Sequence, residues 1–112
     1  MIVYIEGKEI SIREPRKVTL EKYGLTLNNW KEILATQGYR CPVCGNVLAK
    51  TSNIDHFHQR NWKKLPAEKR KMYVRGVLCF FCNKYYVGRS ITVQKAKNVV
   101  TYLEQFEKRK PK

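Results

Sequence analysis

The sequence CPVCG at residues 41–45 and the sequence CFFC at residues 79–82 contain all four cysteines of this 112-residue chain. Zinc binds four ligands in a tetrahedron, and thiolates are among the ligands it prefers. Each CxxC turn can direct two sulfur atoms at one point, so two turns complete the shell. We therefore predict a structural zinc ion, with a redox dithiol or buried free thiols as alternatives. Its ligands would be Cys41, Cys44, Cys79 and Cys82.

The segment TSNIDHFHQR, residues 51–60, lies between the two cysteine pairs and contains both histidines of the chain. Asp55 is a hard oxygen donor that suits Mg²⁺ or Mn²⁺ better than thiolate-bound zinc. Asn83 directly follows Cys82 and offers a second oxygen. His56 can be neutral near pH 7 and can take a proton from water. Together these residues predict a one-metal site for phosphodiester hydrolysis, with His56 as general base.

The spacing of this segment creates a conflict with regular strand geometry. Residues 56 and 58 of a strand face one side, and residue 55 faces the other. Asp55 and His56 can serve one site only if the strand ends or bulges there, and we predict that distortion. His58 would then support the site, or it is simply a surface residue.

A formal net charge of +14, from 23 lysines and arginines against nine acidic residues, indicates a polyanionic partner. Nucleic acid is the leading candidate and an anionic membrane surface the second. The basic segment 59–74 either grips DNA or is a solvated loop. The lysines and arginines that we expect near phosphates are Arg60, Lys63, Lys64, Lys69, Arg70, Lys71, Arg75, Lys84 and Arg89.

The N-terminal sequence MIVYIEGKEISI lacks a basic leader, and no stretch approaches the roughly 18 apolar residues of a membrane helix. The chain is therefore expected to be cytoplasmic, in the host cytoplasm if a phage encodes it. Its first 12 residues alternate apolar and polar side chains, which predicts a β-hairpin closed by Pro15. Residues 26–38 predict an amphipathic helix that Thr26 caps and Gly38 ends.

Further elements follow along the chain. Residues 52–58 and 73–79 read as short strands, the segment 59–74 as loop with a helical turn after Pro66, and residues 81–90 as a short helix. The last segment, 90–110, has the period of a helix, which we expect to pack against the core. Its apolar positions are 93, 96, 99, 100, 103 and 106.

The order CPVCG, IDHFH, VRGVLCFFCNKYYVG resembles the recombination endonuclease VII family of ββα-metal (HNH-like) nucleases. The flanking sequences YGLTLNNWKEILATQGYR and AKNVVTYLEQF are similar too, so the resemblance covers residues 22–106. It implies an α+β, zinc-stabilised ββα-metal fold with flanking helices, extended here by the N-terminal hairpin. It also implies the zinc and catalytic roles given above, with Mg²⁺ or Mn²⁺ on Asp55 and Asn83.

The sequence thus predicts a metal-dependent DNA endonuclease of phage or mobile-element type that acts on duplex or branched DNA as a monomer or homodimer. The alternative is a non-catalytic zinc-ribbon module that binds nucleic acid. We expect a hairpin extension at 1–15, a nuclease domain at 16–108 and a basic tail at 109–112.

Overall fold

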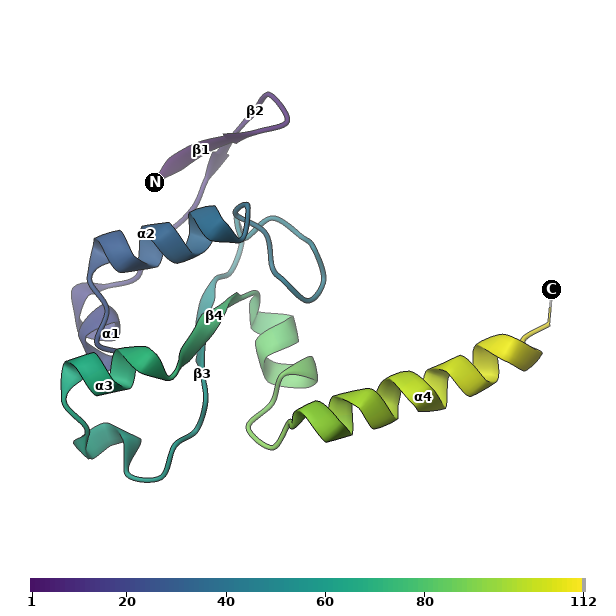
Figure 1. Ribbon diagram of the computed structural model, residues 1–112. Coiled ribbons are helices and arrows are strands. Elements are labelled where there is room, and N and C mark those ends of the chain that lie inside the picture. The colour runs from purple at the N-terminus through teal and green to yellow at the C-terminus, as the bar shows by residue number, and fades with distance from the viewer. Residues whose placement is uncertain (112) are drawn as a thin grey trace.

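Two small antiparallel sheets and several helices make up the computed structural model, which describes residues 1–111 (Figure 1). This arrangement confirms the predicted α+β class. The strands are β1 (Ile2–Ile5), β2 (Lys8–Ser11), β3 (Asn53–His56) and β4 (Val74–Leu78). The helical elements are α1 (Lys17–Lys22), α2 (Leu27–Thr36), η1 (Trp62–Lys64), α3 (Ala67–Met72), η2 (Cys82–Tyr86) and α4 (Val93–Arg109).

The predicted N-terminal hairpin is present as β1 paired with β2. Glu6 and Gly7 form its turn, and both have positive φ angles, 52° and 78°, as two-residue hairpin turns with the twist of the strands require. Ile12, just beyond β2, is fully buried, and its carbonyl accepts a hydrogen bond from the amino group of Met1 at 3.0 Å. The hairpin is therefore attached to the main core at its base.

Helix α2 begins and ends where the sequence predicts. The Thr26 side chain accepts a hydrogen bond from the backbone N–H of Asn29, and the Asn29 side chain accepts one from the N–H of Thr26. These two bonds satisfy N–H groups that have no partner inside the helix. Trp30 and Leu34 are fully buried on one face of the helix, which fixes α2 against the core.

Helices α1 and α2 end with the same backbone motif. Gly24 and Gly38 have φ angles of 71° and 63°, and the N–H of each donates to a carbonyl three residues earlier. The next N–H in each case donates to the carbonyl five residues before it, as in a Schellman ending. Gly24 differs in one respect, because a Cβ atom there would lie 2.1 Å from the carbonyl oxygen of Ala67. Helix α3 thus packs directly onto the end of α1.

The second sheet pairs β3 with β4, and its register shifts between Asp55 and His56. Strand β3 also ends at His56, so the predicted distortion is confirmed. The Gln37 side chain binds the edge of β4 that does not pair with β3. Its amide nitrogen donates to the carbonyl of Val77 at 2.8 Å, and its oxygen accepts from the N–H of Val77 at 2.9 Å. A Cβ at Gly76 would lie 2.9 Å from that oxygen, so glycine leaves room for the amide.

A single core joins the N-terminal half of the chain to the second sheet. Trp30 and Leu34 meet Val77 there, and the partly buried Tyr23 and Ile33 pack around them. The buried members are Ile12, Leu20, Leu25, Trp30, Leu34, Cys41, Leu48, Ile54, Val77, Leu78 and Cys82. The two buried cysteines place one edge of the cysteine cluster inside this core.

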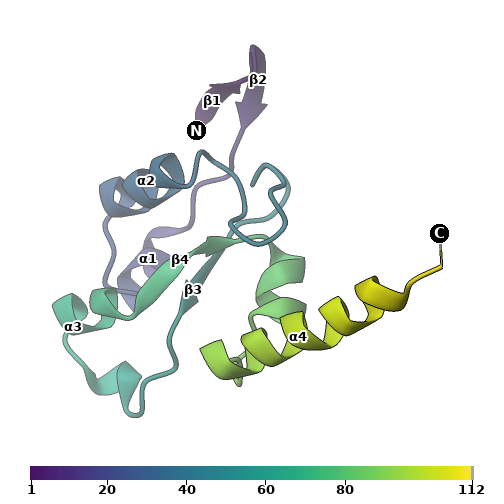
Figure 2. The same ribbon diagram turned by 45° about the vertical axis from the view of Figure 1, so that its right-hand side comes forward.

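Helix α4 forms as predicted, but the prediction that it packs against the core is wrong. None of its residues is buried, and Val93 and Phe106 are 73% and 44% exposed. Both views show α4 extending away from the rest of the chain, beyond η2 (Figures 1 and 2). Residues of the other elements already fill the core, so the apolar stripe of α4 has no partner within residues 1–111.

Residues 1–111 contain no helix that is long and apolar enough to cross a membrane. The predicted basic tail begins at Arg109, the last residue of α4. Lys112, its last residue, lies outside the described part of the chain.

Candidate functional site

The four cysteines converge at the end of β4. Cys41 and Cys44 come from the turn after α2, and Cys79 and Cys82 flank the start of the helical segment that continues into η2. All four Sγ atoms lie within 4.8 Å of one another, and those of Cys44 and Cys79 are 3.8 Å apart. Tetrahedral Zn–S bonds of about 2.3 Å would place the sulfur atoms roughly 3.8 Å apart. The cluster therefore has the dimensions of a zinc site.

The electrostatics of the cluster also favour a cation. Burial raises the pKa of Cys41, but hydrogen bonds from neighbouring backbone N–H groups outweigh it and lower that pKa to about 6. The pKa of Cys82 is raised, mainly by burial and then by the hydrogen bonds of its thiol with the other three cysteines. A divalent cation offsets the repulsion that opposes ionisation of four crowded thiols. The residues present thus fit a structural zinc ion.

Asp55 is buried at the end of β3, and its partner is Arg75. Nε of Arg75 donates to Oδ2 of Asp55 at 2.8 Å, and Nη2 donates to Oδ1 at 2.9 Å. The aspartate is only 6% exposed, so this two-bond pair neutralises a buried charge. Sequence reasoning placed Arg75 among the DNA contacts and missed its pairing with Asp55.

His56 follows on the other side of the register shift, and it is half-buried among aromatic rings. The Trp62 ring stacks on it with centroids 4.4 Å apart and planes at 27°, and Tyr23 meets it edge-on at 5.2 Å. The ring centroid of His58 is 4.4 Å away. Burial lowers the pKa of His56, as do the charges of His58, Lys22 and Arg75, while Asp55 opposes the shift. The imidazole is therefore held neutral near pH 7.

Both histidines line a cavity of about 740 Å³, which we call the histidine pocket. The sequence did not identify Lys22 and Trp62 as residues of this pocket, because neither lies in a recognisable motif. Its full lining is Lys22, His56, His58, Gln59, Arg60, Asn61, Trp62, Lys63, Lys64 and Arg89. Four of the predicted DNA contacts are thus brought together around the histidines, at positions 60, 63, 64 and 89.

The other predicted DNA contacts lie outside this lining. Arg70 donates hydrogen bonds to the carbonyls of Leu65 and Glu21, which join the basic segment to α1. The ammonium group of Lys84 lies 5.5 Å and 5.4 Å from the ring centroids of Phe80 and Tyr85. Lys69 and Lys71 are exposed on α3.

Asn83 is placed by the second cysteine pair. It lies in η2, and its backbone N–H donates to the carbonyl of Cys79 at 3.0 Å. Its side chain is partly exposed and does not line the histidine pocket. Asp55 and His56 are neighbours in β3, and Asp55 does not line the histidine pocket either. Asn83 lies on a separate element, η2.

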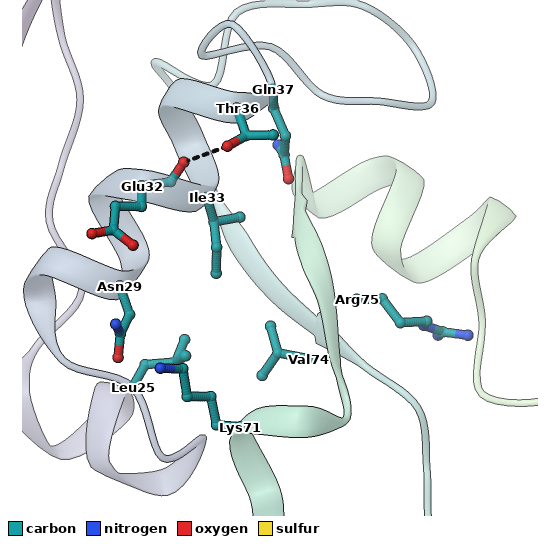
Figure 3. Close-up of a pocket in the computed structure, with 9 residues that line it drawn as sticks. All are labelled: Leu25, Asn29, Glu32, Ile33, Thr36, Gln37, Lys71, Val74 and Arg75. Atoms are coloured by element: carbon teal, nitrogen blue, oxygen red, sulfur yellow. Dashed lines mark hydrogen bonds between the residues drawn. The ribbon is translucent and has the colours of Figure 1, made fainter. Parts of the chain in front are cut away.

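A second cavity, of about 430 Å³, lies between α2, α3 and β4 (Figure 3). Leu25, Ile33 and Val74 supply apolar surface, and Thr36 donates to the carbonyl of Glu32 at its edge. The side chain of Arg75 points away from these residues. No histidine, cysteine or predicted metal ligand lines this cavity.

These features define a small α+β protein with a four-cysteine site suited to zinc and a cation-lined pocket around two histidines. The model of the recombination endonuclease VII family matches residues 16–105, more than half of the chain, and the chain belongs to this family. The family resemblance seen in the sequence is confirmed.

Two curated relatives, each called Gene 59 protein, come from Mycobacterium phage L5 and Mycobacterium phage D29. Each is 35% identical to this chain over 71 residues, which is 62% of the chain. The match spans only 37% and 36% of the length of these two proteins. No solved structure matches the chain.

Proposed function

We propose that the chain is a metal-dependent DNA endonuclease that hydrolyses phosphodiester bonds at the histidine pocket. The observation that carries this proposal is the position of His56, which lies in a pocket lined by cations and directly follows the buried Asp55. Membership in the recombination endonuclease VII family supports the same activity. The match to phage proteins supports a phage origin.

His56 would act as the general base. A neutral imidazole is needed to accept a proton from the attacking water, and burial favours that form by lowering the pKa of His56. The ring of Trp62 limits rotation of the imidazole by stacking on it. His58 and the cations of the pocket would bind the phosphate beside it.

Asp55 and Asn83 would hold the catalytic Mg²⁺ or Mn²⁺ ion, since carboxylate and amide oxygens are ligands that such ions accept. When bound, the ion supplies Lewis-acid stabilisation of charge on the phosphate and the leaving oxygen. The β3–β4 hairpin and η2 would then form the ββα-metal (HNH-like) unit of a nuclease domain at residues 16–108. The structural zinc would keep η2 next to the hairpin.

The contacts to DNA would be mainly electrostatic. Arg60, Lys63, Lys64 and Arg89 surround the histidines and would engage the phosphates on either side of the cleaved bond. Trp62 is buried, so the segment that carries Arg60, Lys63 and Lys64 is anchored next to His56 and not loosely solvated. This favours DNA gripping over the solvated-loop interpretation of residues 59–74.

Cleavage of supercoiled plasmid by the zinc-loaded protein with Mg²⁺ or Mn²⁺ tests the proposal. His56→Ala should lower the rate by about 10²-fold or more while leaving zinc content and DNA affinity unchanged. Gln59→Ala is the matched control, because it changes the same pocket without touching an acid or base. Cleavage by His56→Ala at the wild-type rate would refute the role of His56.

The same assay separates the enzyme from the alternative, a zinc-ribbon module that only binds nucleic acid. The net charge of +14 and the cysteine cluster favour DNA binding in both cases. Intact plasmid and intact branched DNA, with tight binding of both, would establish the binding module. A panel of linear, nicked, flap and four-way-junction substrates would define the DNA cleaved. Sedimentation of the same samples would distinguish a monomer from a homodimer.

A further inference from the structure

A bulge in β4 places Arg75 beside the carboxylate of Asp55. The register pairs Asp55 with Gly76 and His56 with Val74, which leaves Arg75 without a partner in β3. Bulges next to functional sites commonly redirect one side chain. Here the redirected side chain is the one that binds Asp55.

The guanidinium of Arg75 occupies both carboxylate oxygens of Asp55. The two hydrogen bonds measure 2.8 Å and 2.9 Å and form the parallel fork that arginine makes with carboxylates. The Asp55 side chain is only 8% exposed, but that of Arg75 is 36% exposed. The guanidinium can therefore be reached from solvent while the carboxylate behind it cannot.

We propose that Arg75 is a positioning residue that holds Asp55 and competes with the divalent cation for its oxygens. This inference rests on the proposed function, in which Asp55 binds that cation. A carboxylate offers about four lone-pair sites, so it can keep one hydrogen bond while it binds an ion. The positive charge of Arg75 next to a divalent ion nevertheless opposes binding of that ion.

DNA supplies the alternative partner for the guanidinium. Arginine binds phosphate with the same two-bond geometry that it uses on a carboxylate. When Arg75 turns to a backbone phosphate, Asp55 is released for the cation. Cation and DNA therefore each raise the affinity of the protein for the other, because coupling between two binding events is reciprocal.

A purely structural role of Arg75 predicts an effect of opposite sign. If Arg75 only keeps Asp55 ordered, removing it loosens the carboxylate and weakens cation binding. If Arg75 competes with the cation, removing its charge strengthens cation binding. The sign of the change in cation affinity therefore separates the two roles.

The test is Mn²⁺ binding to zinc-loaded protein without DNA, followed by the electron paramagnetic resonance signal of free Mn²⁺. Arg75→Gln should lower the Kd for Mn²⁺ on the order of tenfold, since it removes a unit charge close to a divalent ion. Arg75→Lys keeps the charge and should stay within about threefold of wild type. Lys97→Gln removes one positive charge from the exposed helix α4 and is the control for a lost charge outside the site; its Kd should also stay within about threefold of wild type.

Two results would overturn the inference. One is an unchanged or raised Kd for Mn²⁺ in Arg75→Gln while Asp55→Asn abolishes binding. The other is an equal decrease in Kd in Arg75→Lys, which would show that charge is not responsible. If Asp55→Asn binds Mn²⁺ as well as wild type does, the metal site of the proposed function is refuted instead.

A second measurement uses the wild-type protein and so does not depend on the folding of a variant. Mg²⁺ titration followed by nitrogen-15 and carbon-13 NMR should shift the Nε–H resonance of Arg75 in step with the carboxyl carbon resonance of Asp55. If the shift of the Asp55 resonance reaches its Mg²⁺-saturated value while the Arg75 resonance does not move, Mg²⁺ and the guanidinium do not compete for the carboxylate.

Discussion

Substitution of Gly24 by alanine tests how the basic segment is held over the histidine pocket. Gly24 and Gly38 end two helices with the same hydrogen bonds and nearly the same φ. A Cβ at Gly38 meets nothing within 4 Å, but a Cβ at Gly24 would lie 2.1 Å from the carbonyl oxygen of Ala67 and 2.9 Å from its carbon. Gly38→Ala is therefore a matched control that carries the same backbone strain without the collision.

The expected magnitudes follow from these two contributions. Left-handed backbone strain costs about 1 kcal/mol for a residue with a Cβ, and both variants carry it. The collision at Gly24 is with backbone, so α3 must move by about 1 Å, and overpacking of this kind costs about 1–3 kcal/mol more. Gly24→Ala should therefore lower the free energy of unfolding by about 2–4 kcal/mol in total, against about 1 kcal/mol for Gly38→Ala.

Urea unfolding of the zinc-saturated variants, followed by tryptophan fluorescence, measures both values. Because α3 and η1 are consecutive elements, Gly24→Ala should also shift the NMR resonances of the His56 ring, and Gly38→Ala should not. Losses that agree within about 0.5 kcal/mol would refute the reasoning, since they would show that α3 accommodates the methyl group freely.

Three further predictions concern the pocket, the cysteines and the last helix. Trp62→Ala removes the ring that buries His56, so the pKa of His56 should rise toward 6.5. An NMR titration of the imidazole checks this, and an unchanged pKa would assign the shift to other groups. Cys79→Ser should abolish stoichiometric zinc binding and the cooperative thermal transition, because structural zinc contributes about 10 kcal/mol or more to folding. Metal analysis and circular dichroism measure both effects, and a variant that keeps one zinc per chain would contradict the four-cysteine site. Truncation after Ser90 should lower the free energy of unfolding by less than about 1 kcal/mol, because no side chain of α4 is buried. Loss of the cooperative transition on truncation would show that α4 supports the core.

Features that depend on neighbouring residues were predictable from the sequence. The cap at Thr26, the ending at Gly38 and the N-terminal hairpin each follow from side-chain or backbone chemistry within a few residues. The convergence of the cysteine pairs was predictable because one ion requires all four ligands. The shift between Asp55 and His56 followed from the conflict between strand alternation and a shared site.

Features that depend on distant residues were not predictable. Arg75 lies 20 residues from Asp55, and nothing in its own segment distinguishes it from the other cations near the pocket. Trp62 lies in a polar, basic stretch, yet it is buried against His56 because α1 and α3 bring the stretch back onto the hairpin. The period of α4 identifies an amphipathic helix, but periodicity does not specify which surface, if any, covers the apolar stripe.

The amide of Gln37 has a consequence for how the protein behaves at high concentration. A two-stranded sheet exposes backbone N–H and C=O groups along its outer edges, where strands of other molecules can add and begin aggregation. By donating to and accepting from Val77, Gln37 occupies the place that such a strand would take on β4. One glutamine side chain thus blocks the β4 edge of this sheet to strands of other molecules.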